Sequence, residues 1–382
     1  MRGTHMPEAS QNGAPIPDTR STAVDTPPPP IPRYLHGYED AYAADPRGAA
    51  IQWFRKARFG LMLHYGPYSL PGRHEWLQLH EKIPVAEYAK LMDDFTAAGF
   101  DAEAICRLAV ATQMRYVNIT TRHHDSFCLW DTACTNFNSI KAPCGRDLIA
   151  ELAEACDRHR LGLCLYYSHG RDWRHPHAPN NDLWGGAARP EYDEPQSEYA
   201  TGDDHDLGIY VQFMKDQVTE LLTGYGPIAA IWLDGIAVPL ADRTRTPCPR
   251  DTNQPDNAPQ FECQALYDHI HALQPQVLIS YKQGLLGTED FYSPELEAVR
   301  SRDKPGEVCR TMCDQPHRSY GYLASAAGTH MKLDDAMRAL NEARGAGFNL
   351  LLNTAPRPDG SLDPEDVAVL EEMGRKLRDV EF

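Results

Sequence analysis

The chain has 382 residues, with 37 basic and 54 acidic side chains that give a formal net charge of −17. Such an acidic balance argues against a surface built to neutralise nucleic-acid phosphates or anionic lipid headgroups. No run of about 18 apolar residues offers a membrane span, so we expect neither a nucleic-acid nor a membrane partner. The length suits two or three domains, or one large barrel.

The N-terminal 45 residues differ in composition from the rest of the chain. They contain the run PPPPIP among scattered Ser, Thr, Asp and Gly residues, a composition that buries little apolar surface. We expect residues 1–45 to be a disordered Pro-rich leader and residues 46–382 to form one globular domain. The first six residues, MRGTHM, are typical of a cloning remnant, which leaves open the loss of a native signal peptide. With no recognisable signal and ten dispersed cysteines, the expected location is the cytoplasm.

Short apolar runs alternate with amphipathic segments along residues 46–382. The expected strands are residues 59–64, 116–120, 161–167, 229–234, 277–280 and 349–353, and the helical segments between them include residues 85–98, 147–160, 209–223, 264–273 and 333–346. Strands that are apolar throughout are typical of a parallel sheet buried on both faces. At this length the alternation predicts a (β/α)8-type, TIM-like barrel rather than an open sheet.

Polar side chains follow these strands at their carboxyl ends, where the active sites of such barrels lie. In chain order they are His64, then His123, His124 and Asp125, then Tyr166, Tyr167 and Ser168, then Trp232 and Asp234, and finally Lys282. Histidines, aromatic rings and a carboxylate at one rim indicate a sugar site. Glycoside cleavage needs two carboxyl groups, and Asp234 is the strongest candidate for one of them, because Gly235 lets the chain turn away after it. A helix-capping Asp is the structural alternative.

Nine stretches, in order, resemble the α-L-fucosidases of glycoside hydrolase family 29. They are FGLMLHYGPYS at 59–69, EW at 75–76, YVNITTRHHDSFCLW at 116–130, RD at 146–147, LCLYYS at 163–168, YGPIAAIWLDG at 225–235, DFYSPE at 290–295, residues 307–322, and GFNLLLNTAPRPDG at 347–360. The resemblance covers nearly everything from Trp53 onward. It implies a retaining exo-α-L-fucosidase that hydrolyses terminal α-L-fucosides without a metal or organic cofactor. We expect no C-terminal β-sandwich of the kind that many members possess.

The resemblance also implies roles for two carboxyl groups. The aspartate of the family's WFDG motif is the nucleophile, and WLDG here gives that role to Asp234. The acid/base glutamate is harder to align, and Glu295, which closes DFYSPE, is the leading candidate. Glu307 and Glu289 are the alternatives, with Glu307 interpreted as a structural residue.

A sugar pocket is implied by position as well, and its expected members are His64, Glu75, Trp76, His123, His124, Tyr167, Trp232, Lys282 and Tyr320. Neutral imidazoles can both donate and accept hydrogen bonds, which suits neighbouring hydroxyl groups. Successive strand side chains point to opposite faces, so adjacent histidines are a poor metal site, and no metal is expected. The chain departs from the family's pattern with Tyr65 in HYG, Tyr320 in SYGY, and Lys282 where many members carry Arg.

Other functions remain open at this point. One is an intracellular glycosidase or transglycosidase acting on a deoxysugar of a small natural product, which the changes at Lys282 and Tyr65 motivate. A non-catalytic sugar-binding pseudoenzyme and an interaction scaffold using the Pro-rich leader are two more. The long segments 174–207 and 236–259 are expected to be loops, the second of them on the aglycone side. The expected partner is a carbohydrate or glycoside substrate, and a homo-oligomer is compatible with the sequence.

Overall fold

The computed structural model describes residues 30–181, 188–235, 259–282, 285–295, 304–314 and 317–378. The strands are β1 Phe59–Leu63, β2 Tyr116–Arg122, β3 Gly162–Ser168, β4 Ala230–Asp234, β5 Leu278–Ser280, β6 Glu307–Thr311 and β7 Asn349–Thr354. The α-helices are α1 Glu39–Ala44, α2 Pro46–Ala57, α3 Leu77–His80, α4 Val85–Ala89, α5 Ala102–Ala111, α6 Leu148–His159, α8 Leu207–Gly224, α9 Cys263–Leu273, α10 Leu333–Gly345 and α11 Pro364–Leu377.

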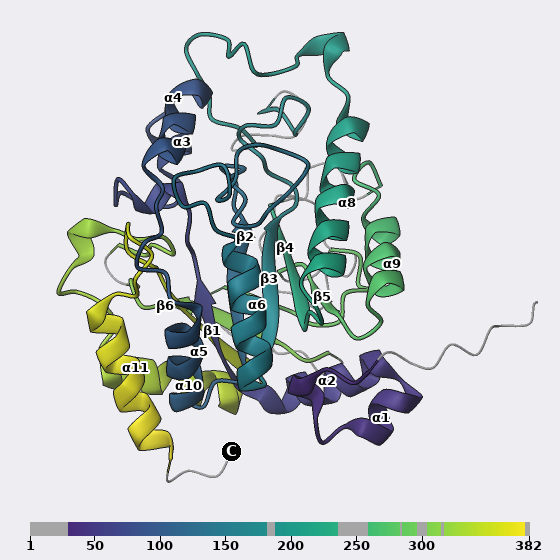
Figure 1. Cartoon of the computed structure of the whole chain (residues 1–382), viewed down its shortest axis with the longest axis vertical. Helices are drawn as coiled ribbons and strands as arrows, with labels where there is room; N and C mark the ends of the chain where they lie inside the picture. The colour runs from purple at the N-terminus through teal and green to yellow at the C-terminus, as the bar shows by residue number, and fades with distance from the viewer. Residues whose placement is uncertain are drawn as a thin grey trace, which may run out of the picture. The chain divides into compact units, whose positions relative to one another are not determined.

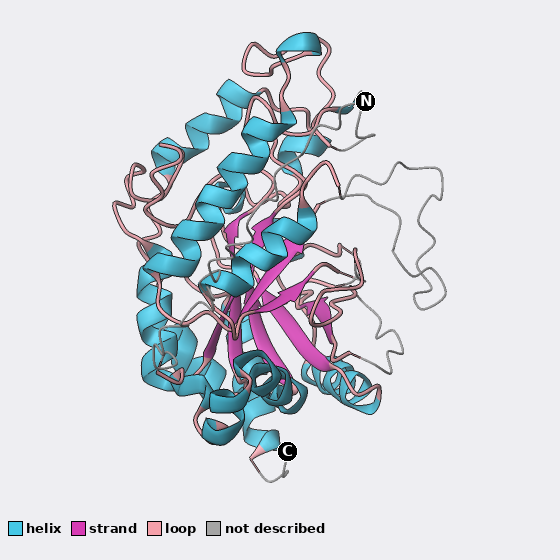
Figure 2. Ribbon diagram, turned by 90° about the vertical axis from the view of Figure 1, so that its right-hand side faces the viewer, coloured by secondary structure: helices cyan, strands magenta, loops and turns pink. Residues whose placement is uncertain are grey.

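The strands form one parallel sheet in the order β5-β4-β3-β2-β1-β7-β6, and the sheet is curled inside a layer of helices (Figures 1 and 2). The two ends of this order are joined by residues 291–295, which make parallel bridges to β5 through Ser280 and Phe291 and to β6 through Glu295 and Cys309. This segment takes the place of an eighth strand between β5 and β6. The strands therefore follow chain order around the ring, as expected for a (β/α)8-type barrel.

Two apolar layers explain why most strand residues are apolar. Inward side chains such as Met62 and Leu351 form a cluster that α2 closes from below with Trp53 and Phe54. A Cβ atom at Gly162 would lie 2.7 Å from a ring atom of Trp53, so this close packing requires glycine there. The outward strand residues pack against the helices in a second cluster. Both faces are therefore buried, and alternate strand residues point to opposite layers.

The six strands expected from the sequence are confirmed, with ends that shift by at most two residues. Strand β6, with the sequence EVCRT, was missed because its charged residues interrupt any apolar run. The helix expected at residues 85–98 is shorter, since α4 gives way to a 3-10 turn at Lys90–Asp94 and the chain becomes extended at Phe95. Phe95 leaves the helix to pack against Tyr65 and Phe127.

The beginning of the fold differs from the expected boundary at residue 46. Residues Arg33–Leu35 form a 3-10 turn and Glu39–Ala44 form α1, and Tyr34, Leu35 and Tyr42 are buried. The part of the expected leader from residue 31 onward is therefore folded with the rest, because its aromatic side chains pack beneath the barrel. Residues 1–29 lie outside the described residues, and their disorder stays a prediction, as does most of the loop expected at 236–259.

Buried Arg122 holds together the strand ends that will carry the site. It donates to Asp172 at 2.6 Å, to the backbone carbonyl of Ser168, and to the hydroxyl of Tyr210 at 3.1 Å. Its guanidinium also lies 4.4 Å from the ring centre of Tyr167. Through these partners the buried charge links β2, β3 and α8 to one another.

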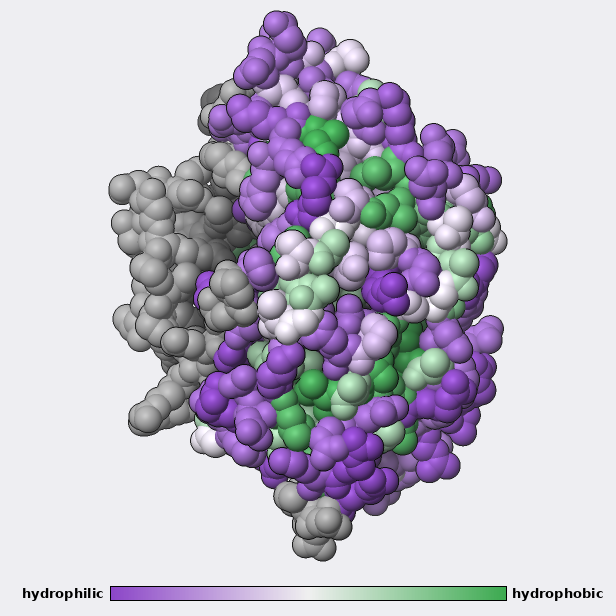
Figure 3. All heavy atoms as spheres, turned by 90° about the vertical axis from the view of Figure 1, so that its left-hand side faces the viewer, coloured by the Kyte–Doolittle hydropathy of each residue, from purple (hydrophilic) through white to green (hydrophobic). Residues whose placement is uncertain are grey.

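The described part of the surface exposes few large hydrophobic side chains. Figure 3 shows one face on which hydrophilic residues predominate and hydrophobic ones form small separate patches. Among the described residues, the large hydrophobic side chains that are exposed are Val110 and Ile209. Isolated residues of this kind are normal on a monomer surface, so the expected homo-oligomer stays a prediction. Within the described part of the chain, no helix is long and apolar enough to cross a membrane.

Candidate active site

Asp234 lies at the inner face of the barrel mouth. Along β4 the residues Ala230, Trp232 and Asp234 alternate with outward-facing ones, so the carboxylate points inward. Gly235 follows with φ +104°, a left-handed conformation that favours glycine, and it turns the chain away as expected. The next described helix, α9, begins after Glu262 and takes no cap from Asp234. Residues 236–258, which follow directly, lie outside the described residues, so the capping alternative is tested only for α9.

The Asp234 carboxylate is held by several donors. Lys282 Nζ lies 3.0 Å from Oδ1, the Tyr166 hydroxyl donates to Oδ2 at 2.8 Å, and the Gly235 amide donates to Oδ1 at 2.6 Å. Burial alone would raise the pKa of Asp234, but Lys282, His124 and Arg171, together with the hydrogen bond from Tyr166, lower it below its ordinary value. Asp234 is thus a buried, ionised carboxylate, the form that a nucleophile needs.

Glu295 stands beside this carboxylate on the irregular segment 291–295. Lys282 Nζ donates to Glu295 Oε1 at 2.9 Å while it contacts Asp234 Oδ1 at 3.0 Å. Those two oxygens are therefore at most about 5.9 Å apart, the sum of the two distances. Retaining glycosidases hold their carboxyl groups about 5 to 5.5 Å apart, and inverting ones about 6.5 to 9.5 Å apart. The upper limit on the distance between these two oxygens is below the inverting range and compatible with the spacing of a retaining pair.

The other two candidate glutamates lie in structural positions. Glu307 begins β6 at the end of the barrel opposite Asp234, where the Tyr116 hydroxyl donates to it at 2.7 Å. Glu289 accepts hydrogen bonds from the backbone amides of residues 285–287 and from the Tyr267 hydroxyl. Neither contacts Asp234, so the alternatives to Glu295 lose their support.

Buried Glu307 should make stability depend on pH. Burial raises the pKa of Glu307 to about 8, so the folded state keeps a proton that the unfolded state loses near pH 4.5. Stability should fall as pH rises between these values, by about 1.4 kcal/mol per pH unit, and level off above pH 8. Glu307→Gln cannot ionise, so its melting temperature should fall less between pH 5 and pH 8. The exposed Glu87→Gln is the control, and equal slopes in wild type and Glu307→Gln would contradict the prediction.

Three histidines form one wall of the site. The ring centres of His64 and His123 are 5.7 Å apart, and those of His123 and His124 are 4.2 Å apart. His64 Nδ1 lies 2.7 Å from Asn353 Oδ1 and His124 Nδ1 lies 2.5 Å from Ser168 Oγ, whereas buried His123 Nδ1 has no hydrogen-bond partner among the described residues. Burial lowers the pKa of all three imidazoles below the ordinary value. The wall is therefore neutral and presents hydrogen-bonding nitrogens.

Aromatic and acidic side chains complete the pocket expected from the sequence. The ring centre of Trp76 lies 5.0 Å from that of His124, the ring centre of Tyr320 lies 5.1 Å from that of His64, and the ring centre of Trp232 lies 5.3 Å from that of Tyr166.

Buried Glu75 precedes Trp76 in the chain. Its Oε2 accepts hydrogen bonds from the Gly321 amide at 2.7 Å and the Ser319 hydroxyl at 3.1 Å. The structure thus brings together all of the expected pocket residues except one.

The exception is Tyr167, which points away from the mouth. Its hydroxyl donates to Gln217 of α8 at 2.8 Å, and its ring lies in the outer apolar layer. The neighbouring Tyr166 faces inward and contacts Asp234. Side chains alternate along a strand, so the residue two positions after the inward-facing Cys164, which is Tyr166, also faces inward. We therefore replace Tyr167 by Tyr166 in the site.

Arg171 is a site residue that sequence reasoning missed. It follows β3 in the segment SHGRDW, and its guanidinium carbon lies 5.2 Å from the ring centre of Trp76. Its positive charge acts on His124 and Asp234, where it favours the neutral imidazole and the ionised carboxylate. The sequence offers no signal for this role beyond the position of Arg171 in a loop at the barrel mouth.

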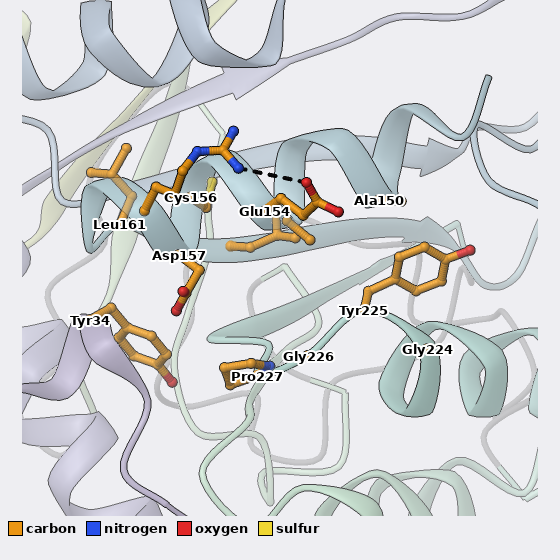
Figure 4. A pocket seen from close by; sticks show the side chains of 13 residues that line it. Tyr34, Ala150, Glu154, Cys156, Asp157, Leu161, Gly224, Tyr225, Gly226 and Pro227 are labelled. Carbon is orange, nitrogen blue, oxygen red and sulfur yellow. Dashed lines mark ion pairs between the residues drawn. The ribbon is translucent and has the colours of Figure 1, made fainter.

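A cavity lies at the end of the barrel opposite Asp234. This cavity of about 480 Å³ is bordered by Tyr34, by α6 and by the turn from Gly224 to Pro227 (Figure 4). Its charged groups include Glu154 and Arg158, which pair with each other at 3.6 Å and are largely exposed. No buried pair of carboxyl groups faces this cavity among its lining residues, so it lacks the chemistry of the mouth. No group of three His, Cys, Asp or Glu side chains suited to a metal ion occurs among the described residues.

Comparisons with known proteins agree with this geometry. A family model described as alpha-L-fucosidase matches residues 36–380. The putative alpha-L-fucosidase 1 of Oryza sativa subsp. japonica is 31% identical over 221 residues, which cover 56% of this chain and 33% of the rice protein. The plasma alpha-L-fucosidase of Homo sapiens is 26% identical over 360 residues, which cover 85% of this chain and 67% of the human protein. The chain thus spans about a third of the rice relative's length.

Solved structures share the fold over most of their length. Alpha-L-fucosidase isoenzyme 1 from Paenibacillus thiaminolyticus has a TM-score of 0.71 at 32% identity, with 87% of this chain and 76% of that one covered. The alpha-L-fucosidase AlfC from Lactobacillus casei, in complex with its α-L-fucose product, has a TM-score of 0.70 at 28% identity and is covered over 97% of its length, against 86% of this chain. The family match extends over nearly all of the barrel, and the chain belongs to the alpha-L-fucosidase family.

Proposed function

We propose that this chain is a retaining exo-α-L-fucosidase that hydrolyses terminal α-L-fucosides. The observation that carries the proposal is the pair Asp234 and Glu295, held close together by Lys282 at the mouth of the barrel. The neighbours support the choice of sugar, since AlfC has been solved with α-L-fucose and a variant of it with 4-nitrophenyl-α-L-fucopyranoside. The proposed substrate is therefore a fucosyl glycoside.

The proposed reaction is a double displacement. Asp234 Oδ attacks the anomeric carbon while protonated Glu295 gives its proton to the leaving oxygen, so the glycosidic bond breaks and a glycosyl ester forms. Glu295 then takes a proton from water, the water oxygen bonds to the anomeric carbon, and Asp234 leaves as a carboxylate. Two inversions give net retention. The scheme uses only side chains of this chain and needs no metal or organic cofactor.

The walls of the pocket suit a 6-deoxy sugar. The neutral nitrogens of His64, His123 and His124 can donate to or accept from neighbouring hydroxyl groups, and His123 Nδ1 has no hydrogen bond to any described residue that would compete. The faces of Trp76 and Tyr320 lie beside these histidines, where they can cover the apolar side of the ring and its methyl group.

The alternative substrate, a deoxysugar on a small natural product, now has weaker support. Tyr65, one of the two changes that motivated it, packs outward against Phe95 and Phe100 and does not reach the pocket. Lys282 remains as the change inside the site. Cytoplasmic location and a homo-oligomeric state stay predictions from the sequence.

Stereochemistry provides the direct test of the proposed function. Wild-type protein is mixed with p-nitrophenyl α-L-fucopyranoside, and the first product is followed by proton NMR before it mutarotates. We expect α-L-fucose to appear first, with the β anomer growing in later. p-Nitrophenyl β-L-fucopyranoside, which should not be cleaved, is the matched control. Release of β-L-fucose first would refute the retaining assignment, and cleavage of neither compound would refute the proposed sugar.

A further inference from the structure

Lys282 is the cation that both candidate catalytic carboxylates share. Its Nζ lies 3.0 Å from Asp234 Oδ1 and 2.9 Å from Glu295 Oε1. The two partners are held unequally, because the Asp234 side chain is 9% exposed and has further donors in Tyr166 and Gly235, while the Glu295 side chain is 37% exposed. Asp234 is therefore the fixed partner of this ion triad, and Glu295 is the more accessible one.

The backbone is adapted to place Lys282 between them. Lys282 has φ +42°, in the left-handed region that an L side chain rarely adopts. Its carbonyl accepts a hydrogen bond at 2.7 Å from the amide of Ser293, two residues before Glu295. The hydroxyls of Ser280 and Ser293 also bond to each other. These hydrogen bonds thus connect the end of β5 to the segment that carries Glu295. Lys282, the shared cation, has a strained backbone conformation at this connection.

We propose that Lys282 acts as a shared counter-ion that serves whichever of the two carboxylates is charged at each step of the reaction. This inference rests on the proposed function. Before attack, Asp234 is ionised and Glu295 is protonated, so one negative charge faces the ammonium. As the glycosyl ester forms, Asp234 becomes neutral and Glu295 loses its proton, and the charge has moved from one partner to the other. The second displacement moves it back.

Because Nζ already contacts both carboxylates, this exchange requires no movement of the lysine. A cation fixed in advance at both positions stabilises the moving charge without reorganisation. An isolated hydroxyl-binding lysine, by contrast, would have no need to touch both oxygens. Lys282 also keeps the two carboxylates from repelling each other before a proton is taken up.

Several other charged or titratable groups lie near this triad. They are His64, His123, His124, Tyr166, Tyr320, Cys309 and Arg171. Burial lowers the pKa of the three histidines and raises that of Tyr166, Tyr320 and Cys309, so these six are neutral at neutral pH. Arg171 adds a second positive charge, which the Lys282 variants leave in place. The pH profile of the reaction should therefore report on Asp234 and Glu295.

The pH dependence of kcat/KM for p-nitrophenyl α-L-fucopyranoside tests the proposal. The acidic limb of the profile requires ionised Asp234, and the alkaline limb requires protonated Glu295. Both limbs should move to higher pH by about 1 to 3 units in Lys282→Met, because a nearby cation favours the charged form of both carboxyl groups. Lys282→Arg keeps the charge, so its limbs should stay in place although its rate falls. Trp76→Phe is the control for damage to the pocket without loss of charge. If Lys282→Met raised KM and left both limbs at their wild-type pH, Lys282 would be a sugar-binding residue only. That result would overturn the proposal.

Thermal unfolding provides a readout that needs no substrate. Glu295→Gln should lower the melting temperature of the wild type at pH 8, because it breaks the contact with Lys282. The same change in the Lys282→Met background should raise the melting temperature, because it removes one of two facing like charges. An equal effect of Glu295→Gln in both backgrounds would refute the shared counter-ion even if no fucoside is cleaved. Failure of the proposed function appears separately, as absence of turnover by the wild type.

Discussion

Asp234→Asn should reduce kcat/KM for p-nitrophenyl α-L-fucopyranoside by about 10⁴- to 10⁶-fold, the range seen when a catalytic nucleophile is removed. The amide has the shape of the carboxylate, its Oδ1 can still accept the hydrogen bond from the Gly235 amide, and its NH2 group can donate to the Tyr166 hydroxyl. It cannot form the glycosyl ester at a useful rate. The loss therefore reflects the missing nucleophile rather than a disturbed pocket, and initial rates at saturating and limiting substrate measure it.

A smaller nucleophile should restore part of this activity. In Asp234→Ala, azide can occupy the space of the carboxylate and attack from the same face, which would give β-L-fucosyl azide of inverted configuration. Asp366→Asn is the matched control, because Asp366 is a buried carboxylate bonded to His330 and Thr354 outside the site. It should lower stability and leave kcat/KM within about threefold. Activity retained in Asp234→Asn would exclude Asp234 as the nucleophile.

The barrel was predictable because its signal is local. Strands buried on both faces are mostly apolar, so short apolar runs such as AIWL at residues 230–233 stand out from the amphipathic helices between them. β6 and the segment 291–295 give no such signal, since they carry Glu307, Arg310 and Glu295 and are recognised only through their pairing with other strands. Closure of the ring depends on pairing between segments that are far apart in the chain, and hydrophobic periodicity does not predict such pairing.

The site was predictable to the same extent. Residues at strand ends, such as Asp234 and His123, follow from the rule that parallel strands meet at one rim. The side chain of Tyr167 was misplaced because the inward or outward direction of a strand residue depends on a register that a fully apolar strand does not reveal. The bridging position of Lys282 could not be read from the sequence either, because it depends on the distance between β4 and residues 291–295, which are far apart in the chain.

Glu295→Ala should affect substrates according to their leaving group. Loss of a general acid costs about 10²- to 10⁴-fold where the leaving oxygen needs a proton. A fucosyl disaccharide, whose alcohol leaves poorly, should therefore lose far more activity than p-nitrophenyl α-L-fucopyranoside, whose phenolate leaves without help. Hydrolysis of both substrates by wild type and variant, followed as fucose release, gives this ratio.

Azide should complete the assignment of Glu295, because it needs no general base. With the p-nitrophenyl substrate the Glu295→Ala enzyme forms its glycosyl ester, and azide entering the space of the lost carboxyl group should accelerate breakdown to α-L-fucosyl azide with retained configuration. Glu289→Gln and Glu307→Gln are the matched controls, since both glutamates are buried and hydrogen-bonded outside the mouth. If the loss of activity depended on the leaving group in either control and not in Glu295→Ala, the acid/base would be a residue other than Glu295. The opposite azide anomers expected at Asp234 and Glu295 place the two carboxyl groups on opposite faces of the sugar, as a double displacement requires.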